Sequence, residues 1–128
     1  MSDGLKRTHV RADATGGAVH DIGGLDFGPI DRSEHDLALW EKRVDAMMIL
    51  LYAKKSLWTV DAMRRTIEDY AQQTYDSTEY YEKWVRAMRN LLVEQEIVTR
   101  PEVEAKMVEV AARNCVQGRT IAAEAVEW

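Results

Sequence analysis

The sequence predicts an all-α protein: a small helical domain of about four helices, preceded by an extended, glycine-rich N-terminal arm. Three observations support this fold class. Six of the seven glycines lie before residue 32, where the apolar residues follow no regular period. From residue 33 onward, apolar residues recur at three- and four-residue steps, the period of a helix. No segment shows the alternation typical of a strand. We therefore expect an arm over residues 1–32 and a helical domain over residues 33–128.

The composition is that of one globular domain. The 128 residues are 46% apolar and 30% charged. A net charge of −5, without basic runs, argues against a nucleic-acid partner. No secretory leader is evident, and no apolar run approaches the ~18 residues that cross a bilayer. Cys115 is the single cysteine, so no intrachain disulfide can form and a reducing compartment is indicated. We expect a cytoplasmic protein without nucleic-acid or membrane partners.

The arm should be ordered only where it lies on another surface, because glycine-rich sequence loses much conformational entropy on folding. It nevertheless carries apolar side chains that a solvated linker would not need: Val19, Ile22, Leu25, Phe27 and Ile30. We expect the arm to wrap a partner chain or to lie on the helical body. A tail without order is the alternative, mainly for residues 1–18.

The first two helices are predicted from start signals and apolar stripes. Ser33 with Asp36 indicates the first start, and a long helix should follow with one apolar face formed by Leu37, Trp40, Val44, Met47, Met48 and Leu51. Thr59 is the expected N-cap of the second helix, and Asp61 favours its positive end. The stripe of this helix comprises Val60, Met63, Ile67 and Tyr70.

The last two helices follow a polar connector, "QQTYDST" (72–78). Ser77 or Thr78 is expected to cap the third helix, whose apolar face comprises Tyr81, Trp84, Val85, Met88, Leu91 and Leu92. The fourth helix should begin at Thr99, with Pro101 in its first turn and Glu102 at the capping-box position.

Few side chains indicate chemistry on their own. His9, His20 and His35 are scattered and have no metal-site spacing, so polar or capping roles are favoured. Cys115 is best interpreted as a structural thiol. Nucleophile-elbow and phosphate-loop motifs are absent. Arg64 stands out, since it lies one position from the apolar stripe and its planar guanidinium needs acceptors that another chain could supply.

Four segments resemble, in order and nearly in spacing, the N-terminal half of the β subunit of nitrile hydratases. They are "VHDIGGLDFG" (19–28), "LWEKRVDAM" (39–47), "WTVDAMRRTIE" (58–68) and "YYEKWVRAMRNLLVEQEIVT" (80–99). "HDIGG" alone is a weak signal, whereas the ordered series is specific. The same region is similar to a small subunit of thiocyanate hydrolase and, more distantly, to the small activator proteins of nitrile hydratases.

The resemblance implies a heteromeric enzyme that hydrates a small nitrile to an amide. In the family, cobalt(III) or iron(III) lies in an α-type partner subunit, in a C-x-x-C-S-C loop with partly oxidised cysteines. That loop is absent here, so this chain is expected to hold no cofactor and to be inactive alone. Family β subunits continue into a β-barrel-like domain, whereas this sequence ends at Trp128. Either a separate small β-barrel subunit replaces that half, or the sequence is cut short.

The resemblance also assigns site residues. Arg64 falls on a family arginine that donates to the oxidised cysteine oxygens, and Tyr80 falls on a tyrosine beside the water at the metal. Trp84 matches an aromatic pocket wall, and Val60 and Met63 match apolar pocket positions.

Three functions therefore stay open: a nitrile hydratase subunit, a thiocyanate hydrolase subunit, or a non-catalytic maturation partner of the α-type chain. Arg64 argues against the last, because a chaperone has no evident need for that contact. Tyr80 and Trp84, four residues apart, should face a cleft shared with another subunit, while Tyr81 belongs to the internal stripe. Three aromatics in one core is the alternative. The sequence does not distinguish cobalt from iron.

Overall fold

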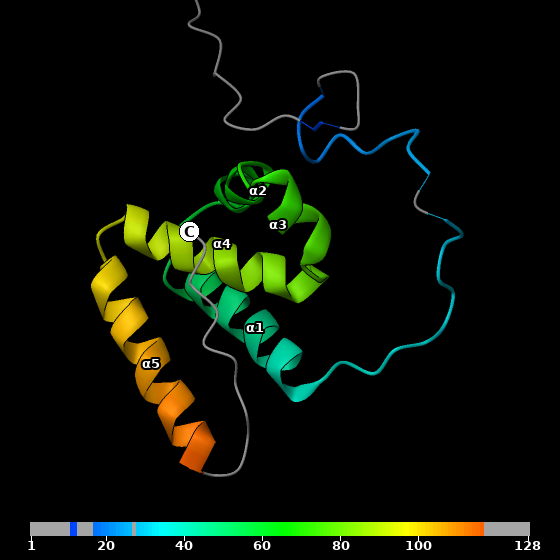
Figure 1. The fold of residues 1–128 in the computed structure, drawn as a ribbon. Helices are drawn as coiled ribbons and strands as arrows, with labels where there is room; N and C mark the ends of the chain where they lie inside the picture. Colours follow the sequence, from blue (N-terminus) through cyan, green and yellow to red (C-terminus); the bar gives the residue numbers. More distant parts are fainter. Residues whose placement is uncertain (1–10, 13–16, 27, 117–128) are drawn as a thin grey trace, which may run out of the picture. The chain divides into compact units, whose positions relative to one another are not determined.

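The computed structural model describes residues 11–12, 17–26 and 28–116. They form α1 (Leu39–Ile49), a π-helical turn η1 (Leu50–Lys54), α2 (Val60–Glu68), α3 (Gln72–Ser77), α4 (Tyr80–Glu94) and α5 (Arg100–Val116) (Figure 1). No strand occurs among the described residues, which confirms the all-α class. The side chain of Cys115, expected to be a structural thiol, lies outside the described part.

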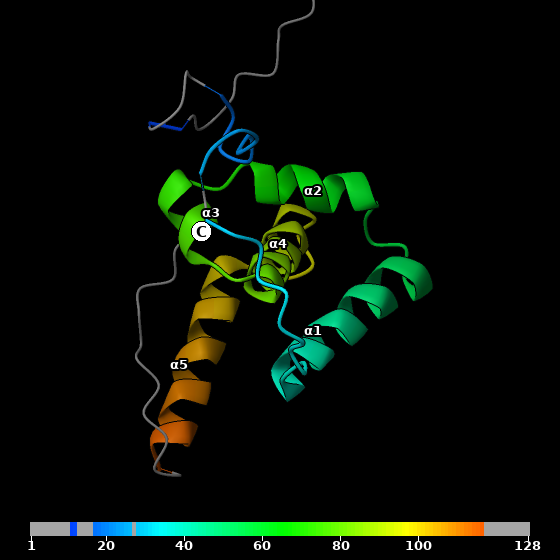
Figure 2. The ribbon, with the colours of Figure 1, turned by 90° about the vertical axis from the view of Figure 1, so that its right-hand side faces the viewer.

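The chain divides into two compact units, Met1–Met88 and Arg89–Trp128, and the boundary falls within α4. Within the first unit, α2 and α3 lie beside the N-terminal part of α4 in both views (Figures 1 and 2). The hydroxyl of Tyr70, just after α2, donates to the backbone carbonyl of Lys83 in α4 at 2.7 Å. This bond ties the two helices together. The division expected near residue 32 stays a prediction.

The first helix begins later than predicted. Ser33 does not start it, because its N–H (2.9 Å) and hydroxyl (2.6 Å) both donate to the carboxylate of Asp31 in a local turn. Residues 28–40 are exposed where described. The helix starts at Leu39, after Ala38, whose N–H donates to the Glu41 carboxylate at 2.6 Å. Only one of the two hydrogen bonds of a capping box is therefore present, the one to Glu41, because an alanine side chain has no acceptor for the second.

The second helix begins as predicted. Before it, η1 ends at Lys54, and Ser56 has a left-handed φ of 51°. The Thr59 hydroxyl then accepts the N–H of Ala62 at 3.1 Å, which confirms the N-cap. The apolar core of the first unit is small and comprises Val19, Val44, Trp58, Met63, Tyr70, Ala87 and Met88.

The predicted connector is wrong, because residues 72–77 form α3. The hydroxyl of Thr78 donates back to the carbonyl of Thr74 at 2.7 Å. Glu79 precedes α4 instead, and its N–H donates to the Glu82 carboxylate at 2.8 Å. The expected cap at Ser77 or Thr78 is thus wrong, since α4 begins at Tyr80 and the residue before it is Glu79.

The described start of the arm lies on the helical body, one of the two expected surfaces. Arg11 is only 2% exposed, and Val19 is fully buried. The guanidinium of Arg11 makes two hydrogen bonds to the carboxylate of Asp76 in α3, at 2.8 and 2.7 Å. It also donates to the carbonyl of Val19 at 2.8 Å. Whether the arm also wraps a partner stays a prediction.

The second unit holds the end of α4 and all of α5. A left-handed residue, Glu96 (φ 58°), follows α4, and the N–H of Ile97 donates to the carbonyl of Leu92 at 3.0 Å. Helix α5 starts as predicted. The N–H of Thr99 donates to the Glu102 carboxylate at 2.7 Å, and the Glu102 N–H donates to the Thr99 hydroxyl at 3.4 Å. None of residues 100–114 is buried.

Candidate functional site

A hollow of about 380 Å³ opens in the first unit, between the arm and helices α2, α3 and α4. Its lining combines aromatic rings, cationic groups and one carboxylate: His20, Arg64, Ile67, Glu68, Tyr75, Tyr80, Lys83 and Trp84. Three residues predicted as site residues, Arg64, Tyr80 and Trp84, therefore surround one space. Their catalytic and binding roles stay predictions.

Arg64 is exposed on α2 and lines the hollow. Among the described residues, its side chain has no hydrogen-bond or ion-pair partner. The guanidinium has five N–H donors in a planar fork that matches anionic oxygens. It is therefore available to acceptors from outside this chain.

The three aromatics at the start of α4 are in ring contact, and the Tyr80 ring meets the Tyr81 ring edge-on with centroids 5.1 Å apart. The Tyr80 side chain is 64% exposed, and its ring meets the Trp84 ring edge-on with centroids 5.9 Å apart. Both line the hollow. Tyr81 points elsewhere: burial, followed by the charge of Asp45 on α1, raises the pKa of its hydroxyl. Tyr80 and Trp84 thus form an open aromatic wall, whereas Tyr81 lies toward α1.

Lys83 is a second cation in the hollow, and its position is fixed. Its Nζ donates to the carbonyl of Thr78 and lies 4.9 Å from the centre of the Tyr75 ring. Burial lowers the pKa of its ammonium, while the nearby carboxylates of Asp76 and Glu82 oppose this shift. A cation held by a carbonyl and an aromatic face loses little entropy when it binds an anion.

The two remaining predicted pocket residues do not line the hollow. Met63 is 2% exposed in the core, and Val60 is 43% exposed at the start of α2. Met63 and Arg64 are consecutive, so their side chains project about 100° apart around the helix. Of these two residues, only Arg64 lines the hollow. The pocket roles of Val60 and Met63 stay predictions.

Sequence reasoning missed several lining residues, although a signal existed. Arg64, Ile67 and Glu68 follow i, i+3, i+4 spacing on α2, and so do Tyr80, Lys83 and Trp84 on α4. Residues at this spacing share a helix face. His20 was set aside as an isolated histidine, yet the arm places its Nε2 3.9 Å from the Glu68 carboxylate.

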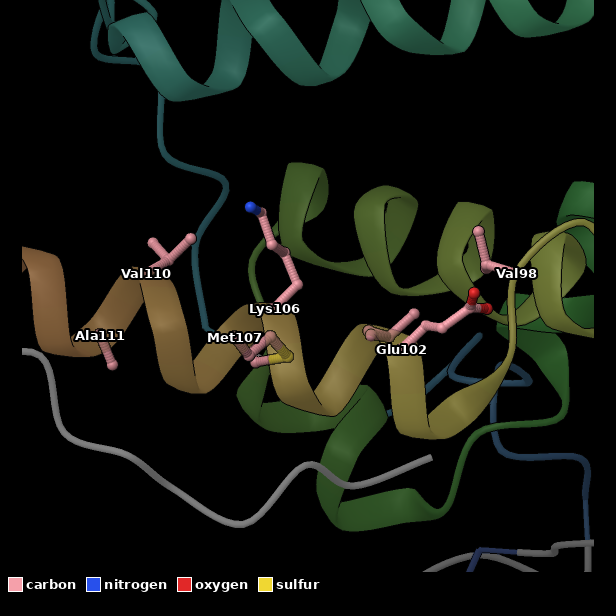
Figure 3. A pocket seen from close by; sticks show the side chains of 7 residues that line it. Val98, Glu102, Lys106, Met107, Val110 and Ala111 are labelled. Atoms are coloured by element: carbon pink, nitrogen blue, oxygen red, sulfur yellow. The ribbon is translucent and has the colours of Figure 1, made fainter.

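An apolar groove of about 630 Å³ lies along α5 in the second unit (Figure 3). Its lining is Val98, Glu102, Val103, Lys106, Met107, Val110 and Ala111. No group of three His, Cys, Asp or Glu side chains in the described part could hold a metal ion. None of the described helices is long and apolar enough to cross a membrane.

The described residues form a small helical domain with an open hollow. Residues 17–127 match the family model described as nitrile hydratase beta subunit, N-terminal. The chain belongs to this family.

Named relatives include subunits of two enzymes. The chain is 32% identical over 107 residues to thiocyanate hydrolase subunit beta of Thiobacillus thioparus, covering 83% of this chain and 68% of the relative. It is 29% identical to nitrile hydratase subunit beta of Rhodococcus erythropolis, covering 68% of this chain but only 44% of the relative. A solved structure of the recombinant apo-form of the Thiobacillus thioparus thiocyanate hydrolase superposes with a TM-score of 0.68 at 28% identity, over 83% of this chain and 67% of that chain.

Proposed function

We propose that the chain is the β-type subunit of a heteromeric, metal-dependent nitrile hydratase, which adds water to a small nitrile to give an amide. Family membership supports the subunit role. The observation that carries the proposal is the Arg64 guanidinium, which lies beside Tyr80 and Trp84 without an acceptor in the described part of the chain. A fork of this kind is suited to anionic oxygens on a partner.

The α-type partner would hold cobalt(III) or iron(III) in a C-x-x-C-S-C loop, and this ion supplies the Lewis acidity of the reaction. Residues of this chain fit such a neighbour. Arg64 would donate two charge-assisted hydrogen bonds to oxidised cysteine oxygens and fix their orientation. The exposed hydroxyl of Tyr80 would orient the reacting water or the nitrile nitrogen. Trp84 would make the substrate side apolar, and Val60 and Met63, which do not line the hollow, stay pocket residues on the resemblance alone.

The exposed apolar surface of α1 and η1 supports assembly with the α-type subunit. Only Val44 is buried over residues 39–54, whereas many large apolar side chains are at least 40% exposed: Leu39, Trp40, Met47, Ile49, Leu50 and Tyr52. Many exposed large apolar side chains on adjoining elements are typical of a protein interface. A separate small β-barrel chain would supply the part of the family β subunit that this sequence does not contain. We place the complex in the cytoplasm.

The subunit role is tested first on the isolated chain. It should show no hydratase activity and should bind no transition metal in stoichiometric amount, because the metal loop belongs to the partner. Elemental analysis after purification without partners measures this. One tightly held cobalt or iron per chain would contradict the assignment.

The site is tested with a matched pair of neighbouring arginines. Arg64→Lys keeps the charge but loses the bidentate fork, so turnover of the reconstituted complex should fall well over tenfold. Arg65→Lys should be nearly silent, since that side chain projects about 100° away. Tyr80→Phe should lower turnover while α4 stays intact. Metal content is measured for each variant, so that a loading defect is recognised. If the two arginine variants have the same turnover, the assignment of Arg64 to the site is wrong.

A second candidate, a subunit of thiocyanate hydrolase, has its own support. The Thiobacillus thioparus β subunit has the higher identity and is covered over more of its length than the Rhodococcus erythropolis subunit. The hollow also carries Arg64, Lys83 and the imidazole of His20 against one carboxylate, Glu68, which suits an anion better than a neutral nitrile. Comparing kcat/KM for thiocyanate and for acetonitrile in wild type and Lys83→Met decides between them: a selective loss on thiocyanate favours this candidate.

A non-catalytic maturation partner of the α-type chain is the remaining possibility. Such a protein leaves after metal loading, whereas a subunit stays. Equimolar recovery of this chain in the purified active complex would exclude the maturation role.

A further inference from the structure

Arg11 lies outside residues 17–127, the range matched by the family model, and yet it is almost fully buried. Its NH1 and NH2 donate to the two carboxylate oxygens of Asp76 at 2.8 and 2.7 Å, and NH1 also donates to the carbonyl of Val19 at 2.8 Å. This arrangement, here called the clasp, consists of Arg11, Asp76 and the Val19 carbonyl. Burying a guanidinium is costly unless its donors are satisfied, so a surface tail would not keep it.

The clasp fixes a short piece of backbone on α3. The N–H of Arg11 donates to the carbonyl of Gly17 at 3.1 Å, and the N–H of Ala12 donates to the side-chain oxygen of Gln72 at 2.7 Å. Val19 is fully buried beside these contacts. Residues 17–19 are therefore held through the carbonyls of Gly17 and Val19, and the next residue is His20, which lines the hollow.

The imidazole of His20 has weak contacts of its own. Its Nε2 lies 3.9 Å from the Glu68 carboxylate, beyond hydrogen-bond distance, and the two side chains are 40% and 47% exposed. A long ion pair between exposed groups contributes little to position. The position of His20 is therefore set by the backbone of Val19, and that backbone is held by Arg11.

We propose that Arg11 is a positioning residue that holds His20 as a wall of the hollow, opposite the groups that would act on the substrate. The inference rests on the proposed function for the meaning of the hollow, but not for the clasp itself. An arginine is required because three acceptors at fixed directions match a planar fork, whereas a lysine ammonium has no such geometry. Arg11, which lies before the matched family range, thus acts on the site through its buried side chain.

The first experiment follows the His20 imidazole signal by NMR in the full chain. Arg11→Gln and Asp76→Asn each break the clasp, and Arg113→Gln removes an exposed arginine on α5 as a control. The His20 signal should shift and broaden in both clasp variants and stay in place in the control. The signal of the exposed His35, which contacts Ser33 at 2.8 Å, should not move in any variant. An unchanged His20 signal in both clasp variants would overturn the inference.

The second experiment measures kcat and KM in the reconstituted complex, with metal content checked. A displaced wall should raise KM roughly tenfold in Arg11→Gln while kcat changes little, and Arg11→Lys should recover only part of the loss. If Arg11→Gln folds poorly, Asp76→Asn, which removes the carboxylate charge and one of its two acceptors, reports on the same clasp. A shifted His20 signal with a wild-type KM would also overturn the inference.

Arg64→Lys in the same assay keeps the two proposals distinguishable. Loss of turnover in Arg64→Lys with wild-type kinetics in the clasp variants removes the inference and leaves the proposed function. A silent Arg64→Lys removes the proposed site, and the NMR signal of His20 then still decides whether Arg11 holds it.

Discussion

Helices α2 and α5 both begin after a threonine N-cap, but their apolar side chains differ in burial. Each starts after a threonine whose hydroxyl meets an N–H of the first turn, at 3.1 Å for Thr59 and 3.4 Å for Thr99. In α2, the stripe residue Met63 is 2% exposed, whereas Met107, an apolar residue of α5, is 47% exposed. The helix start is thus a local property, and burial depends on what covers the helix.

The comparison separates two kinds of apolar side chain. On α2 they stabilise the chain itself, and on α5 they line an open groove (Figure 3). The predictions that follow test this separation, beginning with the largest expected effect.

The largest difference in stability is expected between Met63→Ala and Met107→Ala. Removing the buried methionine leaves a cavity and should lower the free energy of unfolding by about 3 kcal/mol. Removing the exposed one should change it by no more than about 0.5 kcal/mol. Urea denaturation of the two variants measures both. Equal losses would break the comparison, since the groove on α5 would then already be filled in the isolated chain.

Arg11→Gln should loosen the arm from the helical body. The covering of α2 should then become less complete, as it is on α5. Loss of the charged hydrogen bonds should cost about 2 kcal/mol in the free energy of unfolding. The size of the loss is read from urea denaturation at neutral pH, with Arg113→Gln as the control. A stability equal to wild type would show that the clasp contributes nothing to the fold.

The clasp also predicts a pH dependence. The hydrogen bond from Arg11 lowers the pKa of Asp76 below its ordinary value of 3.8. A carboxyl with a lowered folded-state pKa stabilises the fold above the unfolded pKa, and this contribution is lost as the pH falls through the folded pKa. Wild type should therefore lose more stability than Asp76→Asn between neutral pH and acid below pH 3.8. Parallel acid unfolding curves for the two proteins would count against the clasp.

The two threonine caps should contribute equally to stability, although the helices that they cap differ in burial. Thr59→Ala and Thr99→Ala should each lower the stability of their helix by about 1 kcal/mol, since the lost bond is local in both cases. Amide hydrogen exchange in the first turn of α2 and α5 follows each loss separately. A large effect at α2 and none at α5 would show that capping depends on burial.

The smallest effect is expected on the exposed face of α5. Lys106 lies 2.9 Å from the Glu109 carboxylate, and both side chains are more than half exposed. Arg113 also contacts that carboxylate at 2.7 Å. Lys106→Ala should leave the thermal midpoint within error of wild type, because exposed ion pairs contribute little and Arg113 remains. A clear drop would indicate that this face is covered.

The sequence by itself predicted the features that depend on neighbouring residues. The all-α class follows from the apolar period, and the caps at Thr59 and Thr99 follow from bonds within one helical turn. The same reasoning failed at Ser33 and Thr78, because a hydroxyl has several acceptors within reach. At those two positions Asp31 and Thr74 supplied the competing acceptors.

For the candidate site, the sequence and its resemblance singled out Arg64, Tyr80 and Trp84, and the structure places all three around one hollow. Only the tertiary structure added Lys83 to that hollow and paired Arg11 with Asp76, which lies 65 residues away in the sequence. Helix starts and faces are set by residues within a few positions of one another. Ion pairs and cavity walls depend on which helix faces meet, and no local pattern records that.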